Sequence, residues 1–162
     1  MNSFYLDASA LAKRYAPEPG SLLVDHLLTS VSPNRLYVFN VGMAEVISIL
    51  VRKRNTGALS AAALNQAWVV FDAEIATSAV HRTAADDTLV RRSVRLIDTH
   101  SINGTDAIIL RSALDTATDL RATKDDLVLV ASDLRLLRAA QAERLKTFNP
   151  ETDSLADLNS LL

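Results

Sequence analysis

Four acidic residues of this chain have the type and the placement to do chemistry together. They are Asp7, Glu45, Asp106 and Asp133, and each lies at or near the start of a segment with helical spacing of apolar residues. Gathered in one cleft, four carboxylates would raise one another's pKa values unless a positive charge stood among them. Mg²⁺ or Mn²⁺ prefers such oxygen ligands and keeps several waters, which it can orient and acidify for attack on a phosphodiester. The four acids therefore predict a divalent-metal site suited to phosphodiester hydrolysis.

Taken one at a time, these acids have ordinary explanations. An aspartate at the start of a helix is a common N-cap, and Glu45 lies off the centre of its apolar stripe, as a solvated glutamate would. The joint pattern favours a site, because independent caps have no reason to share one edge of a sheet. Asp125 and Asp126 provide an internal comparison, since they precede a strand and are expected at the opposite edge as turn residues.

Two apolar runs predict the strands that position the first and last of these acids. Residues 4–6 form a short run that ends at Asp7, and residues 127–131 form the clearest buried strand, followed at once by Asp133. In an open parallel sheet, ligands bind outside the carboxyl ends of the strands. Both aspartates are therefore expected at the ligand-binding edge.

The rest of the chain continues the alternation of strands and helices. We expect strands over 35–39, within 75–83 and near 145–148, and helices from Asp7 to about Tyr15, over 21–28, from Asn40, over 60–73, 84–98 and 103–116, and after Pro150. Such alternation is typical of an α/β protein with a parallel sheet. A length of 162 residues fits one domain.

Composition narrows the function classes. The chain has no cysteine, so a metal must be held by oxygen or imidazole. No apolar run approaches the roughly 18 residues of a membrane span, and the first residues do not resemble a signal peptide, so we expect a cytoplasmic protein without membrane contact. The net charge of −2 gives no bulk attraction to nucleic acid. Binding of RNA would therefore depend on local basic patches and a bound cation.

Four sequence blocks resemble a known family. They are Tyr5-Leu6-Asp7-Ala8-Ser9-Ala10-Leu11 with Lys13-Arg14-Tyr15 and Pro17-Glu18-Pro19-Gly20, then Ala44-Glu45-Val46, then Thr105-Asp106-Ala107-Ile108-Ile109-Leu110, and then Val130-Ala131-Ser132-Asp133. In order and spacing they are similar to the PIN domain, most closely to the VapC toxins of toxin–antitoxin pairs. The resemblance implies an α/β fold, a PIN-like three-layer sandwich with a central parallel β-sheet flanked by helices. It places the PIN domain at 1–149 and a C-terminal helical extension, packed on the same domain, at 150–162. The segment 75–102 matches nothing distinctive in the family.

The resemblance also implies an activity and its residues. It implies a Mg²⁺- or Mn²⁺-dependent endoribonuclease, with the following residues in the site: Asp7, Glu45, Asp106 and Asp133 as the catalytic acids, Asp7, Asp106 and Asp133 around the metal, and Ser9 and Ser132 as supporting hydroxyls. Our mechanistic hypothesis is that Asp7 and Asp106 ligate the cation directly, whereas Glu45 and Asp133 hold it through water or position the nucleophile. Lys13 or Arg14 is expected to contact a substrate phosphate.

Partners are implied in the same way. A VapC-type toxin of a type II pair acts on RNA, usually forms a homodimer, and is inhibited by a small cognate antitoxin. The apolar helices predicted over 21–28 and 60–73 offer surface for either protein interface, although core packing explains their composition equally well.

Other classes of protein fit the motifs less well. A haloacid-dehalogenase-type phosphotransferase needs a second aspartate two positions after the first, where this chain has Ser9. A receiver domain needs a lysine just after its last strand, whereas Lys146 falls inside or before that strand, and no glycine-rich phosphate loop is present. The basic runs Arg52-Lys53-Arg54 and Arg91-Arg92 are most simply solvated helix faces, and contact with phosphates is the alternative. The main alternative is a catalytically silent PIN fold that binds RNA or protein.

Overall fold

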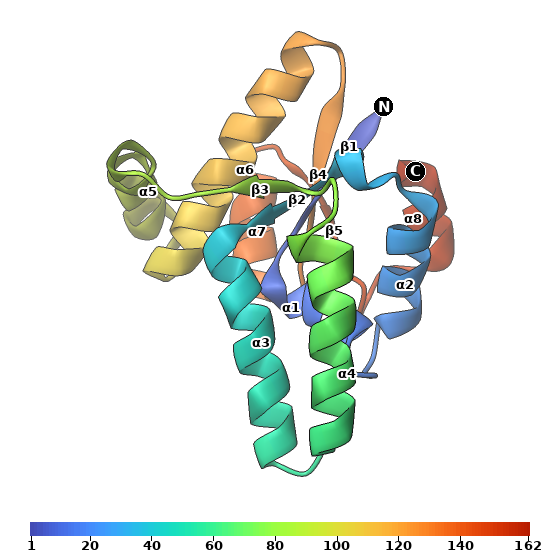
Figure 1. Ribbon diagram of the computed structural model, residues 1–162. Helices are drawn as coiled ribbons and strands as arrows, with labels where there is room; N and C mark the ends of the chain where they lie inside the picture. Colours follow the sequence, from blue (N-terminus) through green and yellow to red (C-terminus); the bar gives the residue numbers. More distant parts are fainter.

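The computed structural model describes residues 1–162 and contains one five-stranded parallel sheet (Figure 1). The strands are β1 (Asn2–Leu6), β2 (Leu36–Phe39), β3 (His81–Thr83), β4 (Asp126–Val130) and β5 (Lys146–Phe148). Their order across the sheet is β3-β2-β1-β4-β5, and every neighbouring pair is parallel. The first strand of the chain is thus the central one, and Leu6 at its end is in register with Val38 of β2 and Val130 of β4.

Helices cover both faces of the sheet. They are α1 (Ala8–Leu11), α2 (Ser21–Ser30), α3 (Asn40–Asn55), α4 (Ala61–Phe71), α5 (Asp87–His100), α6 (Gly104–Ala122), α7 (Leu134–Ala142) and α8 (Leu155–Leu161). Residues from α1 to α4 and from α8 pack on one face, and residues from α5 to α7 pack on the other. Helices α3 and α4 lie side by side as a hairpin that projects from the sheet (Figure 1). The arrangement is the three-layer sandwich predicted from the sequence, and that prediction is confirmed.

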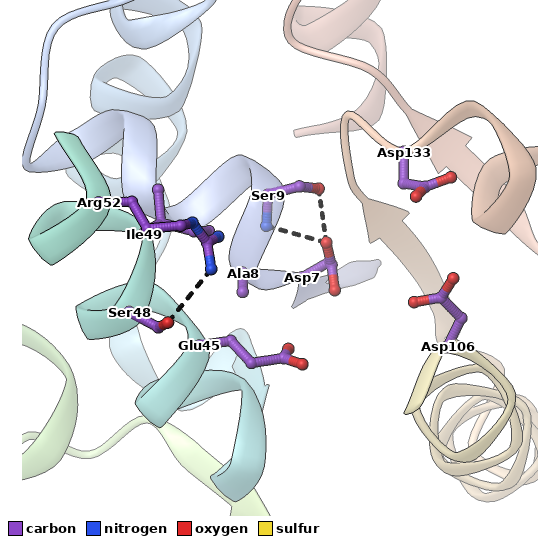
Figure 2. Close-up of a pocket in the computed structure, with 9 residues that line it drawn as sticks. All are labelled: Asp7, Ala8, Ser9, Glu45, Ser48, Ile49, Arg52, Asp106 and Asp133. Carbon is purple, nitrogen blue, oxygen red and sulfur yellow. Dashed lines mark hydrogen bonds between the residues drawn. The ribbon is translucent and has the colours of Figure 1, made fainter. Parts of the chain in front are cut away.

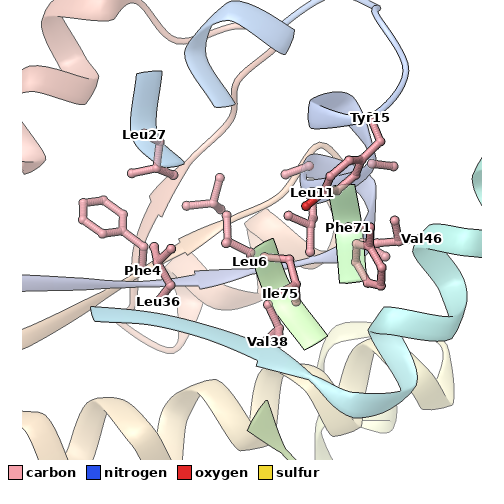
Figure 3. Packing of buried hydrophobic residues seen from close by; sticks show 14 of the residues in the cluster. Phe4, Leu6, Leu11, Tyr15, Leu27, Leu36, Val38, Val46, Phe71 and Ile75 are labelled. Carbon is pink, nitrogen blue, oxygen red and sulfur yellow. The ribbon is translucent and has the colours of Figure 1, made fainter. Parts of the chain in front are cut away.

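The core follows from the alternation of side chains along buried strands. Phe4 and Leu6 of β1 point to the face covered by α1 to α4, whereas Tyr5 between them points to the opposite face. Figure 3 shows the apolar cluster on the face covered by α1 to α4. In it the rings of Tyr15 and Phe71 pack edge to face, with their centroids 5.3 Å apart. Each fully buried large side chain of this kind contributes about 2 kcal/mol. The core therefore fixes β1, and with it the residue that follows β1.

Some predicted boundaries were wrong, each for a local reason. The first helix was expected to run to about Tyr15, but α1 ends at Leu11 and a 3₁₀ turn covers Ala12–Arg14. The helix predicted over 103–116 extends to Ala122, because Ala117 continues the buried stripe of α6. The helix predicted over 84–98 is instead Asp87–His100, with Asp86 as its N-cap.

The region 75–83, where the sequence pattern was ambiguous, also differs from the predicted strand. Only His81–Thr83 of the region 75–83 is a strand, and it is the edge strand of the sheet. A π-helical turn over Asp72–Ala76 follows α4 directly and places Ile75 in the core. At the other end of the chain, α8 packs against α2 and buries Leu158 in the same cluster.

Candidate active site

A pocket of about 290 Å³ lies where β1 and β4 end (Figure 2). Its lining residues are Asp7, Ala8, Ser9, Glu45, Ser48, Ile49, Arg52, Asp106 and Asp133. All four acids singled out in the sequence are among them, although they come from four different parts of the chain. Asp125 and Asp126 lie at the opposite edge, as expected, although Asp126 is the first residue of β4 and not a turn residue.

Asp7 is held in place by the turn that follows β1. Its backbone N–H donates to the carbonyl of Val130 at 2.9 Å, which ties the end of β1 to the end of β4. Its side chain caps α1, because Oδ2 accepts hydrogen bonds from the Ser9 N–H at 2.9 Å and from Ser9 Oγ at 2.5 Å. Ser9 Oγ in turn accepts a bond from the Ser132 N–H at 2.9 Å. Asp7 is only 7% exposed, and both hydrogen bonds from Ser9 go to the same carboxylate oxygen.

Asp133 and Asp106 are positioned by the first turns of their helices. Asp133 caps α7, with Oδ1 accepting from the N–H groups of Arg135 and Leu136 at 2.7 and 3.2 Å. Asp106 lies in the first turn of α6, and its Oδ2 accepts from Asn103 Nδ2 at 2.8 Å. Asn103, not Asp106, is the cap of that helix. Capping and membership of the pocket are therefore compatible, since Asp7 and Asp133 do both.

Glu45 comes from α3, and the same face of that helix forms one wall of the pocket. Ser48, Ile49 and Arg52 follow Glu45 at i+3, i+4 and i+7, which is the spacing of one helix stripe. Of these four, the sequence reasoning singled out Glu45 as a site residue and named Arg52 only as part of a basic run. The spacing itself was the signal that identifies the other three.

The electrostatics of the pocket are those of acids that lack enough positive charge. Burial raises the pKa of Asp7, and nearby Asp133 raises it further, although the bonds from Ser9 oppose the shift. Burial together with Asp133 and Asp7 raises the pKa of Asp106 to about 6. The pKa of Glu45 is raised by burial, Asp7 and Asp106, with Arg52 acting in the opposite direction. A cation in this pocket would relieve the repulsion.

The donor set fits a hard divalent cation, because it consists of carboxylate and hydroxyl oxygens. Each aspartate uses one oxygen for its helix turn, which leaves the other oxygen for a ligand. As the side chains stand, however, no three His, Asp or Glu groups are close enough to hold one ion together. The assignment of Asp7, Asp106 and Asp133 to a metal stays a prediction.

Three other predicted residues lie differently from their expected roles. Lys13 is 3% exposed and pairs with Glu18 and Glu151, and Arg14 pairs with Asp25 and Glu74, so neither lines the pocket. Ser132 contacts Ser9 through its backbone N–H, while its own hydroxyl is buried without a hydrogen-bond partner.

The chain was compared with known protein families, curated proteins and solved structures. No protein-family model matches the chain, and no curated protein matches it by sequence. Several solved structures resemble it, among them the following three. The crystal structure of PAE2754 from Pyrobaculum aerophilum is 19% identical, with a TM-score of 0.62 over 99% of both chains. The structure of FitAB bound to the IR36 DNA fragment is 16% identical, with a TM-score of 0.63 over 93% of this chain and 97% of that one. The crystal structure of FitAcB from Neisseria gonorrhoeae is 17% identical, with a TM-score of 0.58 over 93% and 99%.

These likenesses extend over nearly the whole of each chain, and at this level of identity they show the fold. The PIN-like fold that the sequence blocks implied is confirmed at that level. None of the helices combines the length and apolar character that crossing a lipid bilayer requires.

Proposed function

We propose that this protein is a metal-dependent endoribonuclease that hydrolyses RNA phosphodiester bonds, and that it is the toxin of a type II toxin–antitoxin pair. One observation supports this above all others. Four carboxylates from four elements line one pocket at the carboxyl edge of the sheet, and the pKa values of three of them are raised. Perturbed acids gathered in a cleft are typical of a site that binds or transforms a ligand.

In this proposal Mg²⁺ or Mn²⁺ is held directly by Asp7 and Asp106, with Glu45 and Asp133 acting through water. The free oxygens of the three aspartates are the available ligand atoms. Such a cation supplies charge stabilisation at the phosphoryl group and acidifies water for in-line attack.

The protein's own groups prepare the site. Ser9 holds Oδ2 of Asp7 and is itself fixed by the Ser132 N–H, so the chain Ser132–Ser9–Asp7 orients the least exposed acid of the pocket. The Glu45 carboxylate makes no hydrogen bond within the protein, and burial with nearby Asp7 and Asp106 raises its pKa, which makes it a stronger base toward a water molecule. Its place on α3 lets it position the attacking water from the side of the pocket opposite Asp106 (Figure 2).

The proposed partners follow from the resemblance to VapC-type toxins. They are an RNA substrate, a small antitoxin and a second copy of the chain, in the cytoplasm. FitAB, which has the same fold, was solved bound to a DNA fragment. Apolar side chains available for a protein interface include Leu22 on α2 and Trp68 and Val69 on α4, all of them exposed.

The test is cleavage of a pool of structured and unstructured RNAs by the purified, partner-free protein with Mg²⁺, Mn²⁺ or EDTA. We expect cutting with either metal, none with EDTA, and a loss of about 100-fold or more in Asp7→Asn, because the cation that stabilises the developing charge loses an anionic ligand. Asp125→Asn is the control, since this acid lies at the opposite edge of the sheet. Calorimetry with each metal shows independently whether the pocket is loaded.

One observation favours a second function. As the side chains stand, no three acids are close enough to hold one ion, and a PIN fold that only binds RNA or protein would need no such ion. If protein that binds the metal cuts none of the RNAs, this binding-only function replaces the nuclease.

A further inference from the structure

The wall of the acidic pocket formed by α3 contains a basic residue whose role is not yet explained. Arg52 lies two turns after Glu45 on the same stripe and lines the pocket with it. Its Nη1 donates to Ser48 Oγ at 3.2 Å, and this is the one hydrogen bond of the guanidinium within the protein (Figure 2). Arg52 is exposed, so most of its guanidinium donors face solvent at the rim of the pocket.

Arg52 differs from its neighbours in what its charge contacts. Lys53 forms an ion pair with Glu18, and the guanidinium of Arg54 bonds the side chain of Asn55. No carboxylate lies within 4.0 Å of the Arg52 guanidinium, although the pocket holds four of them and its charge lowers the pKa of Glu45. Arg52 therefore places a positive charge at the pocket that forms no ion pair within the protein.

No other cation is in this position. Lys13 and Arg14 are committed to ion pairs away from the pocket. Arg135, near the opposite rim, has Nη2 at 3.6 Å from Asp133 Oδ2 and does not line the pocket. A polyanion that enters between α3 and the ends of the strands therefore meets one basic side chain that forms no ion pair, and this side chain is Arg52.

We propose that Arg52 binds a non-bridging phosphate oxygen of the RNA, on a nucleotide next to the bond that is cut, with Ser48 orienting the guanidinium. The planar fork of a guanidinium matches two phosphate oxygens and makes charge-assisted hydrogen bonds, which is why arginine is common at phosphate sites. Arg52 is then a substrate-binding residue that compensates for the acids around it. This inference rests on the proposed function, because it takes RNA as the ligand of the pocket.

The experiment measures RNA binding without cleavage. A fluorescent single-stranded RNA is titrated with Asp7→Asn protein in Mg²⁺ at several salt concentrations, and the double variants Asp7→Asn/Arg52→Ala and Asp7→Asn/Arg52→Lys are compared with it. We expect Arg52→Ala to weaken binding about 10-fold, as the loss of a charged hydrogen bond does. The slope of log affinity against log salt should fall by about 0.7, the value for one single-strand phosphate contact. Arg52→Lys should keep the slope and lose part of the affinity.

Arg54→Ala in the same background is the matched control, since Arg54 is an exposed arginine on the same helix that does not line the pocket. Its binding should equal that of the parent. If Arg52→Ala behaves like Arg54→Ala in both affinity and slope, or if the parent binds no RNA, the inference is overturned. Cleavage by wild type and by Arg52→Ala alone is measured in parallel. Absence of cleavage with Arg52-dependent binding would refute the nuclease and retain the phosphate contact, whereas cleavage unaffected by Arg52→Ala would refute the contact alone.

Discussion

Two clusters of charge flank the first helical segment, and they are built on opposite principles. At its start, Asp7 belongs to the acidic pocket, where one unpaired arginine faces four carboxylates. At its end, Lys13 pairs with Glu18 and Glu151, and Lys53 pairs with Glu18. Burial disfavours the charged form of Glu18, but hydrogen bonds from Lys53 and Lys13 outweigh it and lower the pKa of this acid. The acids of the pocket have raised pKa values instead.

The difference separates a structural cluster from a ligand site. Charges around Lys13 are satisfied within the protein, so they join the 3₁₀ turn after α1 to α3 and to the segment before α8. Charges in the pocket are left unsatisfied and cost the protein stability until something positive binds. Neutralising one charge should therefore have opposite effects on stability in the two clusters.

The largest effect on stability is expected from Lys13→Met. Methionine keeps the buried stem but removes the ammonium, so Glu151 loses its ionic partner and Glu18 retains Lys53 alone. We expect the free energy of unfolding to fall by about 2 kcal/mol, less than for a fully buried pair because both acids are partly exposed. Denaturant titration measures it. Lys146→Met, which removes a half-exposed pair with Asp126, should cost less than 1 kcal/mol. Equal stability of Lys13→Met and wild type would contradict a structural role for this cluster.

A smaller effect of opposite sign is expected from Asp106→Asn. The pKa of Asp106 is about 6 in the native protein and near 3.8 otherwise, so between these values the native state binds more protons than the unfolded state. Stability from this group is therefore present at low pH and is lost as the pH rises through that window.

In metal-free solution at pH 7, Asp106→Asn should be more stable than wild type by about 1 kcal/mol, a value reduced for the solvent screening of a half-exposed group. The gain should vanish below pH 4, where both side chains are neutral. Thermal melts across this range measure it, with Asp119→Asn on the exposed face of the same helix as the control. A gain that does not depend on pH would refute this account.

The smallest effect is expected from Ser9→Ala. The bonds from Ser9 lower the pKa of Asp7, so losing the hydroxyl should raise that pKa and move the acid limb of the cleavage profile to higher pH. We expect a loss of about fivefold on the acid side, the equivalent of one hydrogen bond, and a smaller loss at pH 8. Ser9→Thr restores a hydroxyl and should restore the profile. A uniform loss at every pH would show that Ser9 acts on folding and not on Asp7.

The comparison also explains which parts of the molecule the sequence could predict. Buried strands such as β1 and β4 have continuous apolar runs, so their ends, and the acids that follow them, were readable. The strand β3 has exposed residues at the sheet edge and no such run, and the π-helical turn before it depends on how Ile75 packs against distant residues.

Side-chain partners were the least predictable feature. Lys13 and Arg14 have the residue type of phosphate ligands, and only the fold shows that Glu18, Glu74 and Glu151 occupy them. Arg52 lies in a run of three basic residues that resembles an ordinary solvated face. The orientation of α3 against the strand ends determines that only one of these three side chains reaches the pocket. Sequence spacing determines which residues share a face, whereas tertiary packing determines what that face meets.

The central position of β1 has a consequence for how the protein is made. This strand precedes all its neighbours in the chain, yet Asn2 pairs with Asp126 and Asp7 bonds to Val130, so one side of β1 stays unpaired until β4 has been synthesised. Pairings so distant in sequence form slowly, and a strand edge awaiting its partner is prone to aggregate. Asp7 and Asp133 can therefore come together only after the segment that contains β4 has been synthesised. The acidic pocket cannot bind or transform any ligand before that point.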